Sequence, residues 1–178
     1  MKNSKTQKIV IIVTAIFIVA AVLLMFGGNI FKGSGSGSSS RTDMTVMPEA
    51  TDLTAEIKRS TVIEQEFVSS TDDISKVGIV FARDRYLEGV HMVIELLEGN
   101  TVLASNSVNV AKIEDQHRTY VEPASKLTGM KGKTLKLRIY CAEKEDTGMK
   151  IMMSKDVKTT FKFGNKTIDG TLCFSVTE

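Results

Sequence analysis

The chain of 178 residues has no tryptophan, two histidines and two cysteines. His91 and His117 belong to no recognisable catalytic pattern, and no phosphate-binding loop, zinc-protease motif or serine-hydrolase motif occurs. The two cysteines form neither a CxxC pair nor a Cys/His cluster, so they do not indicate a zinc site. These absences predict a protein that is not an enzyme, with no cofactor and no metal site.

The chain also lacks a large excess of charge of either sign. The chain contains 23 basic and 21 acidic residues, and no basic patch is interleaved with aromatic residues, which argues against nucleic acid as a partner. Acidic pairs occur at Asp72-Asp73 and Glu114-Asp115, and a third acidic group covers residues 143–146. None has the D-x-D-x-D-G spacing of a calcium loop, so we interpret all three as solvated turns.

One long uncharged run is present near the N-terminus. Residues 9–26 are apolar except for Thr14, and at helical rise they measure roughly 27 Å, about the thickness of the hydrocarbon core of a bilayer. Three lysines precede the run, and positive flanks stay in the cytoplasm. The sequence therefore predicts a cytoplasmic N-terminus at 1–8, a transmembrane signal anchor at 9–31 and an extracytoplasmic remainder.

The alternative for this run is a cleaved signal peptide. The apolar core of such a peptide is usually about 7–15 residues long, and small residues follow it at the cleavage site. Gly33-Ser34-Gly35 would suit such a site, but the run itself is longer than that core. The length favours the uncleaved anchor, and the bilayer is then the first partner of this cell-membrane protein.

Residues 32–52 contain the stretch GSGSGSSS and predict a flexible linker. From residue 53 the pattern changes to short runs in which apolar residues alternate with polar ones, separated by glycine-containing turns. No long run has helical periodicity. Residues 53–178 are thus predicted to form one all-β domain, an antiparallel β-sandwich of the jelly-roll type. The runs are VIEQEFV, KVGIVFA, HMVIELL, TVLAS, SVNVAKI, RTYVE, TLKLRIYCAE, KIMMS, TTFKF and GTLCFSV.

Several of these runs, in this order, carry a resemblance. They are I-x-Q-x-F from Ile63, I-x-K-V-x-I-x-F-A from Ile74, G-V-x-x-x-I-E-L-x-E-G-N from Gly89, K-I-E-D from Lys112 and L-x-L-x-I-Y from Leu135. The pattern resembles the galactose-binding-like jelly-roll ectodomains of bacterial membrane proteins, many of which serve cell-envelope polysaccharide systems. The resemblance implies a carbohydrate-binding or accessory role, and it carries over no binding residue.

The best candidate for ligand binding is the loop ARDRYLEG. Tyr86 supplies an aromatic ring there, and Arg83 and Arg85 supply charge-assisted donors. The alternative is an ordinary connecting loop with a solvated charge cluster. The expected partners are a cell-envelope polysaccharide or another envelope protein. In the latter case the domain would be a structural scaffold module.

Strand parity places the two cysteines on different faces. Cys141 shares a face with Leu137 and Ile139, whereas Cys173 lies opposite to Leu172 and Phe174. With the apolar faces turned inward, Cys141 should be buried and Cys173 exposed. No disulfide is therefore predicted between them.

Overall fold

The computed structural model describes residues 47–143 and 146–178. The chain divides into two compact units, residues 1–38 and 39–178, and the description below concerns the second. The predicted anchor at 9–31 and most of the predicted linker lie outside the described residues. Within the residues described, no helix has the length and apolar character needed to span a bilayer.

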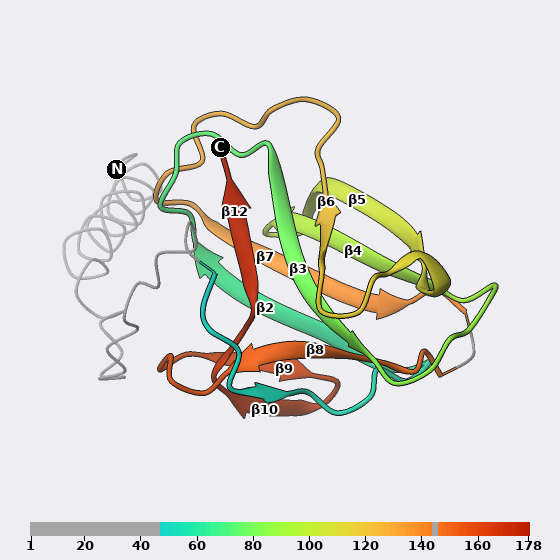
Figure 1. Cartoon of the computed structure of the whole chain (residues 1–178). Coiled ribbons are helices and arrows are strands. Elements are labelled where there is room, and N and C mark those ends of the chain that lie inside the picture. Colours follow the sequence, from blue (N-terminus) through green and yellow to red (C-terminus); the bar gives the residue numbers. More distant parts are fainter. Residues whose placement is uncertain (1–46, 144–145) are drawn as a thin grey trace, which may run out of the picture. The chain divides into compact units, whose positions relative to one another are not determined.

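The regular structure of the described chain is strand except for one short 3-10 helix, as the alternating runs predicted (Figure 1). The elements are β1 (Asp52–Leu53), β2 (Val62–Val68), β3 (Lys76–Arg83), β4 (His91–Glu98), β5 (Thr101–Asn109), the 3-10 helix η1 (Val110–Lys112), β6 (Arg118–Val121), β7 (Thr134–Cys141), β8 (Met149–Ser154), β9 (Thr160–Phe163), β10 (Lys166–Asp169), β11 (Thr171–Leu172) and β12 (Phe174–Thr177).

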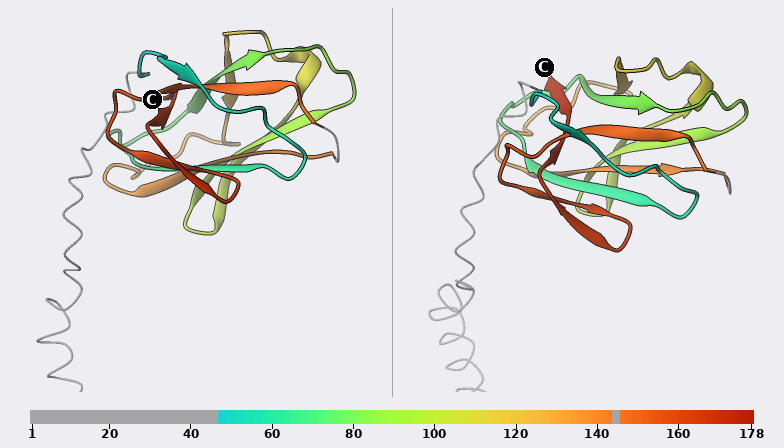
Figure 2. Two further views of the ribbon diagram at one scale, coloured as in Figure 1. Left: turned by 90° about the horizontal axis from the view of Figure 1, so that it is seen from below. Right: turned by 60° about the horizontal axis from the view of Figure 1, so that its bottom comes forward.

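These strands form two sheets, each with antiparallel pairing, that face each other as a β-sandwich (Figure 2). One, called the β3 sheet, has the order β1-β8-β3-β12, with β11 beside β8 and β6 beside β3. The other, called the β2 sheet, has the order β10-β9-β2-β7-β4-β5. The all-β antiparallel fold is confirmed. Pairing with β8 begins at Thr51, whose N–H donates to the carbonyl of Met153 at 3.0 Å.

The core lies between the sheets and follows the alternation of the sequence. On β2, Ile63, Gln65 and Phe67 are buried, and the glutamates between them point outward. Phe67 meets Phe174 of the opposite sheet edge-on, with ring centroids 5.0 Å apart. Aromatic pairs of this geometry add to the burial of apolar surface that holds two sheets together. The predicted core positions Phe67, Phe81 and Phe174 are all buried, as expected.

Gln65 is a polar side chain inside this core. Its Nε2 donates to the carbonyls of Glu66 and Thr160, at 3.1 and 3.3 Å. Its Oε1 accepts from the hydroxyl of Thr171 and the backbone N–H of Leu172, at 3.4 and 3.3 Å. Since Gln65 lies in the β2 sheet and β11 in the β3 sheet, one amide joins the two layers while its own polar atoms stay satisfied.

The predicted exposure of Cys173 is wrong. Cys173 is only 1% exposed, because it lies where the last strand leaves β8 and joins β3. Its N–H donates to Met152 on β8 at 2.8 Å, and its carbonyl accepts from Val80 on β3 at 3.1 Å. At this crossing the pleat is interrupted, so Leu172, Cys173 and Phe174 are all buried and parity no longer assigns a face. Cys141 is buried, as predicted.

The runs TVLAS and SVNVAKI also differ from expectation. Residues 101–109 form one strand, β5, and the pairing register with β4 shifts near Leu96 and Leu97. The end of the second run is η1, where the side chain of Asn109 accepts from the N–H of Ala111 at 2.9 Å. The asparagine side chain replaces a strand partner here and starts the short helical turn.

Candidate functional site

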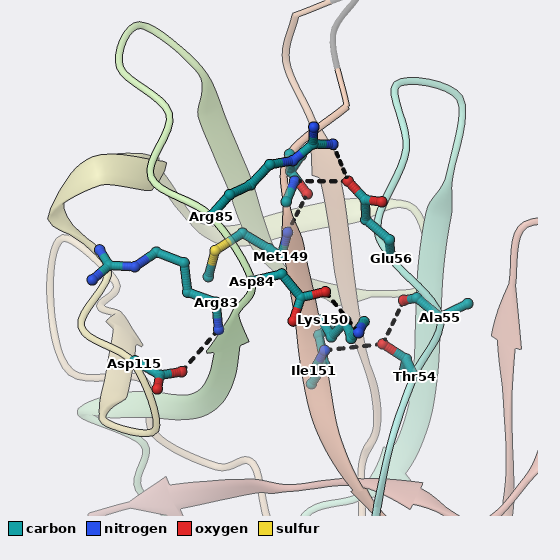
Figure 3. Close-up of polar contacts among 12 residues, drawn as sticks. Thr54, Ala55, Glu56, Arg83, Asp84, Arg85, Asp115, Met149, Lys150 and Ile151 are labelled. Carbon is teal, nitrogen blue, oxygen red and sulfur yellow. Dashed lines mark hydrogen bonds and ion pairs between the residues drawn. The ribbon is translucent and has the colours of Figure 1, made fainter.

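The three residues that the sequence singled out lie at the end of β3 and in the loop that follows it. Arg83 lies beside Tyr86, whereas the side chain of Arg85 points away from that of Arg83 (Figure 3). The guanidinium carbon of Arg83 lies 5.6 Å from the ring centroid of Tyr86, within cation–π range, and Tyr86 is 60% exposed. The backbone N–H of Arg83 donates to Asp115 at 2.8 Å, and its Nη1 donates to the carbonyl of Ile113 at 3.1 Å. Arg83 therefore ties the end of β3 to the segment after η1.

Arg85 is tied to another part of the chain. Its Nη2 lies 2.6 Å from Oε1 of Glu56, an oxygen that also accepts from the N–H of Gly148 at 3.0 Å. The hydrogen bond that Arg85 donates to Glu56 raises the pKa of Arg85 above its usual value. Gly148 has φ +63°, and a Cβ at this position would lie 2.4 Å from Cγ of Arg85. The side chain of Arg85 therefore passes over the turn at a position where glycine leaves space for it.

The neighbouring residue, Asp84, completes this junction. Its carboxylate lies 2.6 Å from Nζ of Lys150 on β8, and its N–H donates to the carbonyl of Gly148 at 2.9 Å. Figure 3 shows these contacts converging from β3, β8 and the segment before β2. Both arginines of the predicted site are thus engaged within the chain. The ring of Tyr86 is exposed and contacts Arg83 through its face.

A second cluster lies on the outer side of the β2 sheet. We call it the charged face; its members are Glu64, Glu66, Glu95, Lys136, Arg138, Tyr140 and Lys162. Antiparallel register places Glu64, Arg138 and Glu95 side by side across β2, β7 and β4. Cross-strand neighbours of opposite charge attract each other. The acidic and basic side chains of this face can therefore lie close together without net repulsion.

The contacts on the charged face are close. Nη2 and Nε of Arg138 lie 2.6 and 2.7 Å from Oε2 of Glu95, and the hydroxyl of Tyr140 donates to Oε1 of the same carboxylate at 3.3 Å. Burial, followed by the charge of Glu95, raises the pKa of Tyr140, which keeps the phenol protonated as a donor. Lys136 lies between Glu64 and Glu66, with Nζ 3.5 and 3.9 Å from their Oε1 atoms.

A cavity of about 210 Å³ opens on the charged face towards β9 and β10. Its lining is polar apart from one ring and consists of Glu64, Glu66, Lys136, Thr160, Phe161, Lys162 and Thr167. Carboxylate, ammonium and hydroxyl groups converge there on a small volume. Such a set can accept and donate hydrogen bonds to a ligand rich in hydroxyl groups.

A third polar cluster joins β4 to the end of β7. Glu143 accepts from the backbone N–H of His91 at 2.6 Å and lies 2.8 Å from its Nδ1. Burial opposes ionisation of Glu143, but the hydrogen bonds from His91 outweigh it and lower the pKa of that carboxyl. The thiol of Cys141 approaches the same carboxylate at 3.9 Å. In residues 47–143 and 146–178, no group of three His, Cys, Asp or Glu side chains could hold a metal ion.

A cavity of about 590 Å³ lies where β1 and β8 of one sheet meet β9 and β10 of the other. We call it the edge groove. The residues that line it are Asp52, Leu53, Thr54, Ala55, Ser60, Thr61, Met153, Lys155, Phe161, Phe163, Gly164, Asn165, Lys166 and Ile168. Figure 1 shows β8, β9 and β10 together at the bottom of the view.

The sequence held a signal for the charged face but none for the edge groove. Acids at alternate positions of VIEQEFV and bases at alternate positions of TLKLRIYC mark two outward faces of opposite charge. This pattern predicts a shared charged face only if β2 is known to pair with β7. The edge groove combines residues from 52 to 168 and depends on how two sheets end, which no local pattern encodes.

Comparison with protein-family models and with curated proteins produced no match to this chain. The assignment of function therefore depends on the geometry of the domain itself.

Proposed function

We propose that the chain is a membrane-anchored extracytoplasmic binding protein whose β-sandwich contacts cell-envelope polysaccharide through the charged face. The single observation that carries the proposal is the polar cavity of about 210 Å³ on that face. It offers charged donors and acceptors held in place by neighbouring strands. Binding groups that are already positioned lose little freedom when a ligand arrives. No catalytic step is part of the proposal.

The strand connections support a jelly roll of the galactose-binding-like type. Successive strands cross between the layers: β2, β4, β7 and β9 belong to the β2 sheet, and β3, β6 and β8 belong to the β3 sheet. Only β4–β5 and β9–β10 are hairpins within one sheet. Repeated crossing of this kind is typical of double-sheet jelly rolls.

The location is proposed from the sequence. The apolar run at 9–31 would act as an uncleaved signal anchor with residues 1–8 in the cytoplasm, and residues 32–52 would link it to the domain. Protease added to intact cells or protoplasts should then digest residues 41–178. Complete protection of these residues would contradict the location, and a mature N-terminus near residue 36 would indicate a cleaved signal peptide.

The polysaccharide proposal is tested with residues 41–178 on an array of bacterial envelope polysaccharides. Lys162→Ala and Glu66→Gln alter two exposed members of the charged face and should weaken binding at least tenfold, because each removes charge-assisted hydrogen bonds. Lys131→Ala is the matched control, since Lys131 is exposed in a turn and does not line the cavity. Tyr86→Ala tests the loop after β3 in the same assay.

The outcome separates this proposal from the scaffold alternative. Binding that depends on the charged face supports polysaccharide recognition, whereas loss only with Tyr86→Ala would move the site to the loop. No polysaccharide binding, together with co-purification of a membrane protein with wild-type and all variants, would favour the structural scaffold instead.

A further inference from the structure

The edge groove differs in chemistry from the charged face. Phe161 and Met153 are buried at its base, and Phe163 and Ile168 are half-buried on the side of the β2 sheet. Leu53, on the side of the β3 sheet, is 40% exposed. These apolar side chains form a surface that a ligand with an alkyl chain can cover.

Three charged residues line the edge groove: Asp52, Lys155 and Lys166. Lys155 is paired with the carboxylate of Asp52, so its charge is already compensated. Lys166 on β10 has no ion-pair partner among the residues that the structure describes, and it is exposed. An uncompensated cation beside an apolar groove is complementary to a molecule with an apolar body and an anionic end.

We propose that the edge groove binds a single-chain anionic amphiphile, a fatty acid, with its alkyl chain along the apolar wall and its carboxylate at Lys166. A methylene group takes about as much room as a water molecule, about 30 Å³. The groove volume of about 590 Å³ is therefore sufficient for a chain of a dozen carbons. The groove shares Phe161 with the cavity on the charged face, but its other lining residues are different, and fatty-acid binding does not depend on polysaccharide binding.

The source of the fatty acid follows from the proposed anchor. The groove begins at Asp52, and about 20 linker residues between it and residue 31 would span roughly 25 Å as a flexible chain. A domain held at that distance from the bilayer meets single-chain amphiphiles that leave the membrane. This step rests on the proposed location, whereas binding itself does not.

The test is calorimetric titration of dodecanoate, below its micelle concentration, into residues 41–178. All strand pairings described lie in this part of the chain, and its fold is first checked by a cooperative thermal transition. We expect one saturable site, with decanoate roughly tenfold weaker because two methylenes fewer are buried. Dodecyltrimethylammonium, which has the same chain length and the opposite charge, should bind more weakly than dodecanoate.

Three variants locate the site. Ala55→Phe places a ring in the groove from an exposed position and should reduce dodecanoate affinity more than tenfold. Lys166→Glu should weaken dodecanoate several-fold without weakening dodecyltrimethylammonium. Lys158→Glu makes the same charge change at an exposed lysine outside the groove and should leave both affinities unchanged. If Ala55→Phe fails to fold, Leu53→Glu serves in its place.

Several results would overturn the proposal: no saturable binding to the folded wild-type domain, equal affinity for decanoate and dodecanoate, or unchanged binding to folded Ala55→Phe. Binding to lipid vesicles without binding to monomeric dodecanoate would also overturn it, since it would indicate a membrane surface as the ligand. None of these results bears on the polysaccharide array, so either proposal can fail while the other holds.

Discussion

The reactivity of the two cysteines, Cys141 and Cys173, depends on how deeply each thiol is buried. Both side chains are buried, and burial raises both thiol pKa values, that of Cys173 to about 11. The thiolate is the reactive form, so neither thiol should react readily in the native state. We expect titration with a thiol reagent to find almost no reactive group in the folded domain, and two after unfolding without reductant.

Two other results would be informative. A cysteine that reacts quickly in the native domain would show that one of the two is exposed. If no thiol appears on unfolding until reductant is added, the cysteines are joined in a disulfide, and the prediction from strand parity fails.

Glu143 gives the domain a defined response to acid. Its pKa lies below its ordinary value in the folded domain, so the carboxylate stabilises the fold fully above the unfolded pKa. That contribution is lost as the pH falls through the folded pKa. Because the side chain is 35% exposed, we expect an effect of under about 1 kcal/mol.

The measurement is the free energy of unfolding in guanidinium chloride at pH 7 and pH 3. The decrease between the two should be smaller for Glu143→Gln than for the wild type. Glu88→Gln, at an exposed loop glutamate without an ion pair in the described chain, is the control and should follow the wild type. An equal decrease for Glu143→Gln would mean that the contact with His91 does not favour the carboxylate.

At the scale of elements, Gly170 is the point where the chain passes from β10 in one sheet to β11 in the other. Its φ is +116°, and a Cβ would lie 2.5 Å from the carbonyl oxygen of Ser154, a backbone atom that cannot move aside. Gly170→Ala should therefore cost about 2 kcal/mol or more. Gly164→Ala, at φ +59° with open space around it, should cost only about 1–2 kcal/mol.

Chemical denaturation of both variants tests this comparison. Equal costs would show that backbone conformation alone limits Gly170 and that the close approach to β8 relaxes. A larger cost at Gly164 would be incompatible with the space that the structure shows there.

The elements also show what sequence reasoning could and could not reach. Alternation located most of the strands and their buried faces, because a strand with one face in the core has apolar residues at every second position. It missed the short strands β1 and β10. It failed at Cys173, where the strand changes partners, and at residues 110–112, where an asparagine side chain starts a helical turn. Both features depend on contacts distant in sequence or on side-chain geometry.

The sequence also predicted one part of the candidate site and missed another. Tyr86 is exposed beside Arg83, as the loop composition suggested, yet Arg85 is held by Glu56, nearly 30 positions earlier in the chain. Nothing local to ARDRYLEG predicts that partner. Binding surfaces built from several strands, such as the charged face, become visible only when the pairing is known.

At the scale of the whole molecule, residues 41–178 should fold without the N-terminal unit. The core and the strand pairings described all lie within this fragment. We expect a soluble fragment with a β-type circular dichroism spectrum and one cooperative thermal transition. A helical spectrum, or unfolding without cooperativity, would contradict an independent all-β domain. The full chain in lipid nanodiscs provides the comparison, and its domain should unfold at a similar temperature.

The position of β1 has a mechanical consequence. Any tension along the proposed linker would enter the domain at Thr51, and backbone hydrogen bonds from Thr51, Thr54 and Ile57 join this segment to β8. Pulling from that end would break these hydrogen bonds one after another. β2 would resist separation from its sheet, because it lies between β7 and β9 and is paired on both sides. Leu53 and Ala55 would move away with β1, so stretching the tether would dismantle one wall of the edge groove while the rest of the sandwich stays folded.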